Sequence, residues 1–265
     1  MKKSASSKII IVLICLYLVL PLILTFLYSI FTEWNEVLPK GLTLRYYKDI
    51  LLDGNFLISV IHTIIVSIVP FIICTTVVLL ALYVIVVYHP EWDKYTQMLC
   101  NIPYAIQGVI LAISILSLYV NAPQPFSNRF VMVVLTYCIV ILPYIYRGLK
   151  NSLDTINANR LIEAAQMLGA NKFYAFFAVV VPNILSGITI VAMLSISMVF
   201  GDFVIVNIIG GSYFQTTQMY LYKKLFQSGQ ASSVVIVVMF GIALFMSAIM
   251  NSLKNKGRQN RKETN

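Results

Sequence analysis

The amino-acid sequence predicts an all-α integral membrane protein with six transmembrane helices and a long polar loop between the fourth and the fifth. Of its 265 residues, 59% are hydrophobic and 11% are charged, which is far too apolar for an ordinary soluble domain. The apolar residues are also gathered into runs, and a helix of about 20 such residues can cross a bilayer. The predicted spans cover residues 9–31, 56–88, 99–120, 130–146, 183–207 and 231–253.

The first span follows Lys2, Lys3 and Lys8. Its apolar run is longer than the core of a signal peptide and has no small-x-small cleavage site, so we expect an uncleaved helix. Residues 32–55 are expected to form a long outer loop, because they combine several carboxylates with an interfacial aromatic residue, Trp34.

Proline is expected to kink the third span, and polar or basic segments follow the fourth and the sixth. Pro103 lies inside the third span. The fourth span leads into the polar loop, residues 147–182. After the sixth span we expect a disordered basic tail, residues 254–265, so that residues 1–253 form a single membrane domain.

The basic residues predict the orientation of the chain. Thirteen of the 19 Lys and Arg residues fall on the side of the two termini and the polar loop. Cytoplasmic loops carry an excess of basic residues, so both termini and the polar loop are expected in the cytoplasm. Because these residues lie at the ends and in loops, the net charge of +9 does not indicate nucleic-acid binding.

The sequence shows little of the residue patterns that are typical of catalytic or metal-binding sites. The four cysteines lie in or beside apolar runs, where small buried side chains are the simplest interpretation. The two histidines, His62 and His89, have no partner at metal-ligand spacing. No Gly-Lys dipeptide occurs, so the chain lacks the phosphate-binding loop of nucleotide hydrolases. We therefore predict a non-enzymatic protein without a cofactor of its own.

The polar loop contains the most specific motif of the chain. Glu163-Ala164-Ala165 is followed by three residues and Gly169, and nine residues later by Val179-Val180-Val181-Pro182. Helical spacing predicts a short amphipathic helix, capped by Asp154 or Thr155, with Gly169 as a left-handed stop and Asn171 capping a second helix. One face of the first helix would carry Leu161, Ala164, Ala165 and Leu168, and another would carry Arg160, Glu163 and Gln166.

This pattern closely resembles the EAA loop of permease subunits of binding-protein-dependent ABC importers, which have the MetI-like type I fold. Val179 and Val181 replace the usual Ile and Leu and keep the surface apolar. The resemblance implies that the loop is a coupling helix that docks on a separate ATPase, with Glu163, Ala164, Ala165, Gly169 and Pro182 as the coupling residues. The other interpretation is an interfacial helix that only covers the membrane surface.

The same resemblance implies a bacterial cell (inner) membrane as the location of the chain, and it implies further partners. They are two ATPase subunits that bind ATP and magnesium, a second permease subunit that is identical or homologous, and an extracytoplasmic substrate-binding protein. The signals Gly201-Asp202-Phe203 and Gly210-Gly211, with Leu38-Pro39 in the outer loop, resemble the polyamine, phosphonate and iron branch. We therefore expect a substrate such as spermidine, putrescine or 2-aminoethylphosphonate.

Three residues of the fifth span are candidates for the translocation path. Asp202 is its one carboxylate, and ionisable residues inside spans often have a function. Its distance from Pro182, on the order of 30 Å along a helix, also fits an interfacial position. Ser195 and Ser197 can line a path or simply pack helices together.

Two other classes of function remain open. An ATP-independent channel or secondary carrier would need paired charges or broken helices at mid-membrane, and neither is evident in the sequence. A membrane anchor for an assembly would tolerate polar changes in the fifth span.

Overall fold

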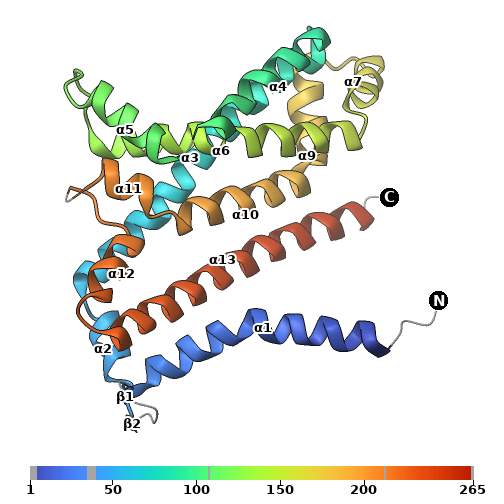
Figure 1. Cartoon of the computed structure of the whole chain (residues 1–265). Coiled ribbons are helices and arrows are strands. Elements are labelled where there is room, and N and C mark those ends of the chain that lie inside the picture. The colour runs from blue at the N-terminus through green and yellow to red at the C-terminus, as the bar shows by residue number, and fades with distance from the viewer. Residues whose placement is uncertain (1–4, 35–39, 107, 212, 264–265) are drawn as a thin grey trace. The chain divides into compact units, whose positions relative to one another are not determined.

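The computed structural model describes residues 5–34, 40–106, 108–211 and 213–263. The all-α fold is confirmed, because helices form most of the described chain and its two strands have three residues each (Figure 1). Leu38-Pro39 of the predicted outer-loop signal lies outside the described residues. The elements are α1 (Ala5–Ile30), β1 (Phe31–Glu33), β2 (Lys40–Leu42), α2 (Arg45–Leu51), α3 (Gly54–Val87), η1 (Pro90–Trp92), α4 (Asp93–Asn101), η2 (Ile102–Ala105), α5 (Gly108–Tyr119), α6 (Arg129–Thr155), α7 (Ala158–Met167), α8 (Lys172–Tyr174), η3 (Ala175–Val180), α9 (Val181–Asn183), α10 (Leu185–Gly201), α11 (Val204–Ile209), α12 (Thr217–Leu225) and α13 (Gly229–Glu263).

Among the described residues, four helices are each long and apolar enough to cross a membrane, and two bent pairs raise the number to six if each pair is one span. The single helices are residues 10–30, 54–87, 129–155 and 229–249. The bent pairs correspond to the predicted third and fifth spans. In the third, η2 contains Pro103 and separates α4 from α5, so the interruption lies where proline predicted it.

The fifth predicted span differs from the observed helix. α10 ends at Gly201 and does not continue to Asn207, because Asp202 has an extended backbone with φ −79° and ψ 130°. Before α10, the segment Lys172–Asn183 meets it at a bend of 66°. The basic tail also differs from its prediction, since α13 continues as a helix to Glu263 where we expected disorder.

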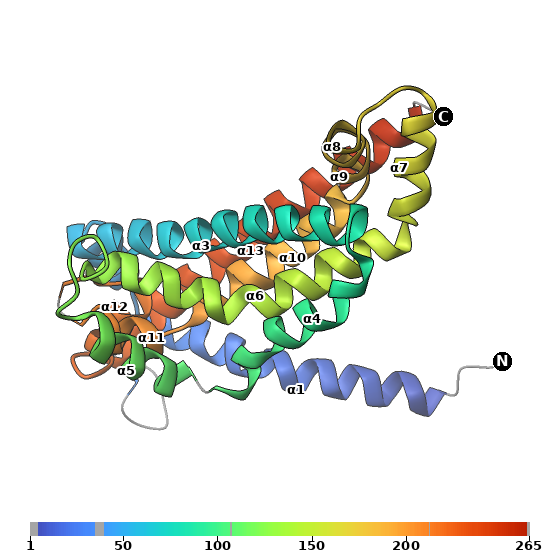
Figure 2. The same ribbon diagram turned by 90° about the horizontal axis from the view of Figure 1, so that it is seen from above.

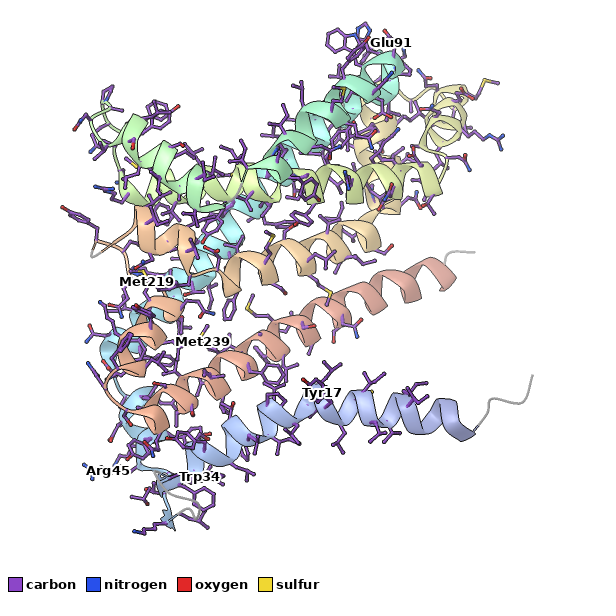
Figure 3. All side chains as sticks on the ribbon, in the orientation of Figure 1. Tyr17, Trp34, Arg45, Glu91, Met219 and Met239 are labelled. Carbon is purple, nitrogen blue, oxygen red and sulfur yellow. The ribbon has the colours of Figure 1, made fainter. Side chains whose placement is uncertain are left out.

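Contacts divide the chain into two compact units, and the prediction of a single domain stays a prediction. The first unit contains residues 1–60 and 217–244. Its β1 and β2 pair antiparallel, with Phe31 opposite Leu42, and Trp34 and Arg45 lie at this end of the unit (Figure 3). Tyr220 of α12 donates a 2.7 Å hydrogen bond to Asp53, which lowers the pKa of that carboxyl group.

The second unit contains residues 61–216 and 245–265, and its core is built on α6. Tyr137, Ile141, Ile145 and Leu149 recur every four residues on α6 and are each at most 1% exposed. α10 lies beside α6 in both Figure 1 and Figure 2. Two glycines permit this close approach, because a side chain on Gly148 would collide with Val191 and one on Gly187 with Ser152.

We predict that Gly187→Ala destabilises the protein. An added Cβ at this position would lie 2.7 Å from Ser152 Cβ, so rotating the Ser152 side chain cannot relieve the collision and the helices must separate. Overpacking of this kind costs about 1–3 kcal/mol. Thermal unfolding in detergent should show a melting temperature several degrees lower. Gly241→Ala on α13, where an added Cβ meets open space, is the control, and equal melting temperatures would contradict the prediction.

Candidate functional site

The segment from the end of α6 to α10 contains the EAA-like motif, and α7 is its central helix. α6 continues through Thr155, and Asn157 precedes α7 in the left-handed region with φ 50°. Neither Asp154 nor Thr155 caps α7, so that prediction was wrong. Both side chains bond back to α6, because Asp154 pairs with Lys150 at 3.1 Å and Thr155 donates to the Asn151 carbonyl at 2.7 Å.

α7 has one face packed on the chain and one face exposed. Ala158, Ile162 and Ala165 form the buried face, with exposures of 5%, 5% and 8%. This differs from the predicted apolar face, since Ala164 is exposed and Leu168 is 90% exposed. Glu163, Gln166 and Met167 are exposed too, with Met167 at 89%. The end of α7 therefore presents two bare apolar side chains, Met167 and Leu168.

A tight turn after α7 follows the prediction closely. Gly169 has φ 87°, in the left-handed region that favours glycine. The N–H groups of Gly169 and Ala170 donate to the carbonyls of Gln166 and Ala165. Asn171 caps α8, since its side chain accepts a 2.7 Å hydrogen bond from the Tyr174 N–H. Both the left-handed stop and the second cap are confirmed.

The helix beyond this turn is irregular. η3 is a π-helix, and α9 contains Pro182, which has no N–H to donate. The Asn183 side chain donates to the Val179 carbonyl at 2.8 Å and so supplies a hydrogen bond at this point. Phe176 of η3 is fully buried and lies 5.3 Å from the Tyr83 ring of α3. The segment after α7 is thus anchored to α3.

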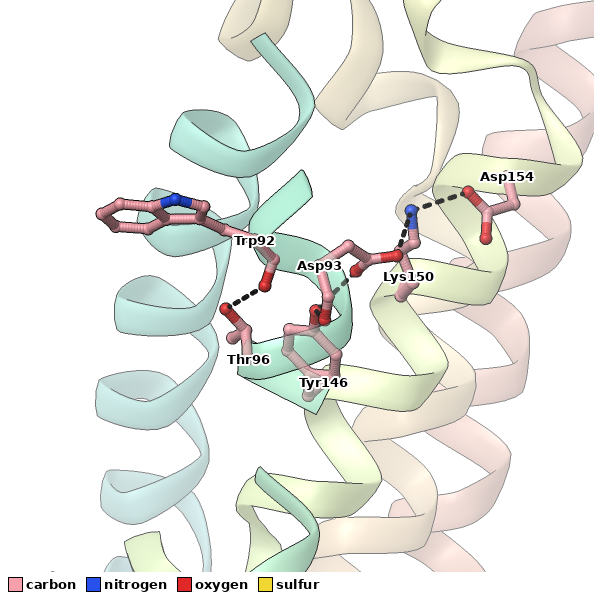
Figure 4. Close-up of polar contacts among 6 residues, drawn as sticks. All are labelled: Trp92, Asp93, Thr96, Tyr146, Lys150 and Asp154. Atoms are coloured by element: carbon pink, nitrogen blue, oxygen red, sulfur yellow. Dashed lines mark hydrogen bonds and ion pairs between the residues drawn. The ribbon is translucent and has the colours of Figure 1, made fainter. Parts of the chain in front are cut away.

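A polar cluster lies where the end of α6, just before α7 in the sequence, meets the start of α4. Lys150 Nζ lies 3.3 Å from Asp93 and 3.1 Å from Asp154, and Tyr146 donates a 2.7 Å hydrogen bond to Asp93 (Figure 4). A cavity of about 550 Å³ lies beside these residues and reaches Arg160 of α7. The sequence alone did not predict this cluster. Lys150 and Asp154 have helical i, i+4 spacing, but Asp93 is far away in the sequence.

The three path candidates do not share one surface. Ser195 is 1% exposed, and its hydroxyl has no hydrogen-bond partner among the described residues. Ser197 is exposed. Asp202 Oδ2 accepts hydrogen bonds from the Tyr137 hydroxyl at 2.8 Å and from the Ile205 N–H at 2.9 Å. Asp202 thereby holds the first turn of α11 and links it to α6, a structural role that sequence analysis did not identify.

Asp202 also lines a cavity of about 290 Å³. Three tyrosines share this lining, Tyr104, Tyr137 and Tyr144. Because Tyr137 and the Ile205 N–H both bond Oδ2, the cavity combines a fixed carboxylate with aromatic side chains. No group of three or more His, Cys, Asp or Glu residues that could hold a metal ion occurs in the part of the chain that the structure describes.

Residues 63–258 match the family described as binding-protein-dependent transport system inner membrane component. The chain belongs to this family. Its members are transport permeases of the inner membrane and not enzymes.

Three relatives of this family member show the range of similarity. The spermidine/putrescine transport system permease protein PotB of Haemophilus influenzae is 26% identical over 156 residues, which are 57% of this chain and 54% of the relative. The putative 2-aminoethylphosphonate transport system permease protein PhnV of Salmonella typhimurium is 22% identical over 200 residues, which are 76% of this chain and 75% of the relative. The spermidine/putrescine transport system permease protein PotC homolog of Mycoplasma genitalium is 22% identical over 217 residues, which are 80% of this chain and 74% of the relative.

We predict that Asp202→Ala destabilises the permease and Asp202→Asn does so much less. Alanine removes the acceptor that holds both the start of α11 and the Tyr137 hydroxyl, a loss of about 0.5–2 kcal/mol for the helix contact alone. Asparagine keeps an acceptor oxygen. Thermal unfolding of both variants checks this prediction. Equal stability of Asp202→Ala and wild type would show that the carboxylate does not stabilise the junction between α10 and α11.

Proposed function

We propose that the chain is the membrane-spanning subunit of an ATP-driven importer and that α7 is its coupling helix. It works with a second permease subunit, identical or homologous, with two ATPase subunits that bind ATP and magnesium, and with an extracytoplasmic binding protein. The excess of basic residues supports a cytoplasmic location for both termini and for α7. The loaded binding protein docks on the outer loops of the permease. Closure of the ATPase then moves α7, and this movement switches the opening of the path between the two sides of the membrane.

The exposed apolar end of α7 is the observation that carries this proposal. Met167 and Leu168 are 89% and 90% exposed on a helix whose opposite face is buried. Burial of each side chain in a partner would contribute about 1.5–3 kcal/mol. Gly169 follows at once, and no atom lies within 4 Å of its absent Cβ, so a partner backbone can approach closely. Glu163 and Ala164 are exposed as well and can meet the same partner.

We predict that the variant Met167→Ser with Leu168→Ser, and separately Gly169→Asp, loses the ATPase. The first removes the apolar end of α7, and the second opposes the left-handed turn and adds a charge to the docking surface. Co-purification of the ATPase and ATP-dependent uptake into vesicles should fall together, while membrane insertion stays normal. Leu225→Ser, which changes another exposed leucine on α12 of the first unit, should keep the ATPase bound.

The opposite result would favour a different class of protein. If both α7 variants retain the ATPase and ATP-dependent uptake, α7 is not the coupling helix. Uptake that needs no nucleotide would instead support an ATP-independent channel or secondary carrier.

For the substrate we propose a polyamine, such as spermidine or putrescine, or a related amine such as 2-aminoethylphosphonate. The relatives named for polyamine and 2-aminoethylphosphonate transport support this choice. The cavity at Asp202 agrees in chemistry, because a carboxylate and tyrosine rings both attract an ammonium group. Ser197 and, after a rearrangement that exposes it, Ser195 would extend the path along α10.

We predict that Asp202→Asn lowers uptake of labelled spermidine or putrescine about tenfold or more. The variant keeps an oxygen for Tyr137 and Ile205 but removes the negative charge that would attract the amine. ATPase co-purification should be unchanged, which separates a path defect from a docking defect. Asp202→Glu, which keeps the charge, is the matched variant. Normal uptake by Asp202→Asn would exclude Asp202 as a charge-bearing path residue.

A further inference from the structure

One short turn touches both sides of the coupling segment. Residues 88–93, which we name the α3–α4 turn, connect α3 to α4. Asp93 at its end contacts α6 just before α7, and Tyr88 at its beginning contacts α8 just after α7. We infer that the α3–α4 turn is a second element moved by the coupling helix, so that α7 transmits its displacement to α4 as well as to α6 and α10. This inference rests on the proposed coupling role of α7.

The contact before α7 is ionic and half-buried (Figure 4). Lys150 bridges Asp93 and Asp154, and the Lys150 and Asp93 side chains are 24% and 32% exposed. Tyr146, at 2% exposure, donates to the second carboxylate oxygen of Asp93. Asp93 is therefore held by two side chains of α6 that are one helical turn apart. Partial burial makes such a pair more specific in geometry than a surface ion pair.

The contact after α7 is aromatic. Lys172 Nζ lies 4.9 Å from the centre of the Tyr88 ring, and the Tyr88 and Tyr83 hydroxyls are 3.2 Å apart. Tyr83 in turn lies 5.6 Å from Phe173 and 5.3 Å from Phe176, between ring centres. The first turns after Gly169 are thus packed on the end of α3 through rings and one cation.

These two contacts leave α7 little freedom to move alone. Lys150 and Lys172 lie on either side of α7 in the sequence, and both reach the same turn, so a displacement of α7 acts on it from two points. α4 begins at Asp93 and is separated from α5 by the interruption around Pro103. A force on Asp93 can therefore tilt α4 without requiring the same motion of α5. Packed elements of this kind move as bodies between discrete positions.

The first test measures substrate taken up per ATP hydrolysed in proteoliposomes with the ATPase and the binding protein. The double variant Tyr88→Leu with Asp93→Asn releases both contacts. We expect it to keep the ATPase bound and to hydrolyse ATP within about twofold of wild type, while uptake per ATP falls about tenfold. Lys150→Arg should retain coupling, because it keeps the charge. Lys94→Gln is the matched control, since Lys94 adjoins Asp93, is exposed and has no ion pair among the described residues.

A contact that only stabilises the fold would give a different result. The double variant would then melt at a lower temperature but keep the wild-type ratio of uptake to hydrolysis, which would overturn the inference. The same wild-type preparation separates this failure from a failure of the proposed function. If wild-type chain does not retain the ATPase at all, both proposals fall, whereas a bound ATPase with an unchanged ratio overturns only the inference about the turn.

A second test asks directly whether the turn and the coupling segment move together. Tyr88→Cys and Lys172→Cys, placed in a chain whose native cysteines are replaced, can be joined by a short bis-maleimide. The two substitutions remove the contact between Lys172 and the Tyr88 ring, so we expect uptake per ATP to be lower before cross-linking and to recover after it, because the link makes the two residues travel as one body. Loss of uptake on cross-linking would show relative motion between turn and coupling segment and, like an absence of recovery, would contradict the inference.

Discussion

The satisfaction of backbone hydrogen bonds is the constraint on which the rest of this structure depends. In apolar surroundings an unpaired N–H or C=O costs several kcal/mol, so a spanning helix must pair its backbone groups along its length and each break needs a substitute partner. The breaks in the second unit show such substitutes. Asp202 accepts from the Ile205 N–H where α10 gives way to α11. Asn183 donates to the Val179 carbonyl beside Pro182, and Asn171 accepts from the Tyr174 N–H after the left-handed turn. At each of these three interruptions, a polar side chain therefore forms a hydrogen bond with a backbone group.

A single helix, α6, connects these places. Its Tyr137 holds Asp202 near the cavity, and its Gly148 allows the close approach to α10. Two residues later Lys150 forms an ion pair with Asp93 at the start of α4, and α6 then ends at Thr155, shortly before α7. Because the core face of α6 is buried along its length, we expect α6 to move as a rigid body in the proposed coupling. The geometry of the proposed coupling and of the proposed path thus depends on the same helix.

What the sequence predicted correctly was local, whereas its misses were of two kinds, local hydrogen bonds that compete with the expected one and contacts between distant segments. Apolar runs predicted the helices, Gly169 predicted the left-handed stop, and Asn171 predicted the cap, because each signal lies within a few residues of its effect. The cap of α7 was mispredicted because Lys150 engages Asp154, and the end of the fifth span was missed because Asp202 bonds forward to Ile205. The Asp93 contact could not be inferred, since nothing in the sequence relates two residues from separate spans.

The exposed end of α7 has to be weighed against the alternative that lipid covers it. An interfacial helix buries one continuous apolar face in the membrane and turns its polar face to water. On α7 the continuous apolar face, Ala158, Ile162 and Ala165, is already used against the chain itself. The exposed apolar residues are confined to the last turn, Met167 and Leu168, and share the exposed surface with Glu163 and Gln166. A small apolar tip surrounded by polar groups suits a pocket in a protein better than a bilayer, because a pocket can supply hydrogen-bond partners around an apolar centre.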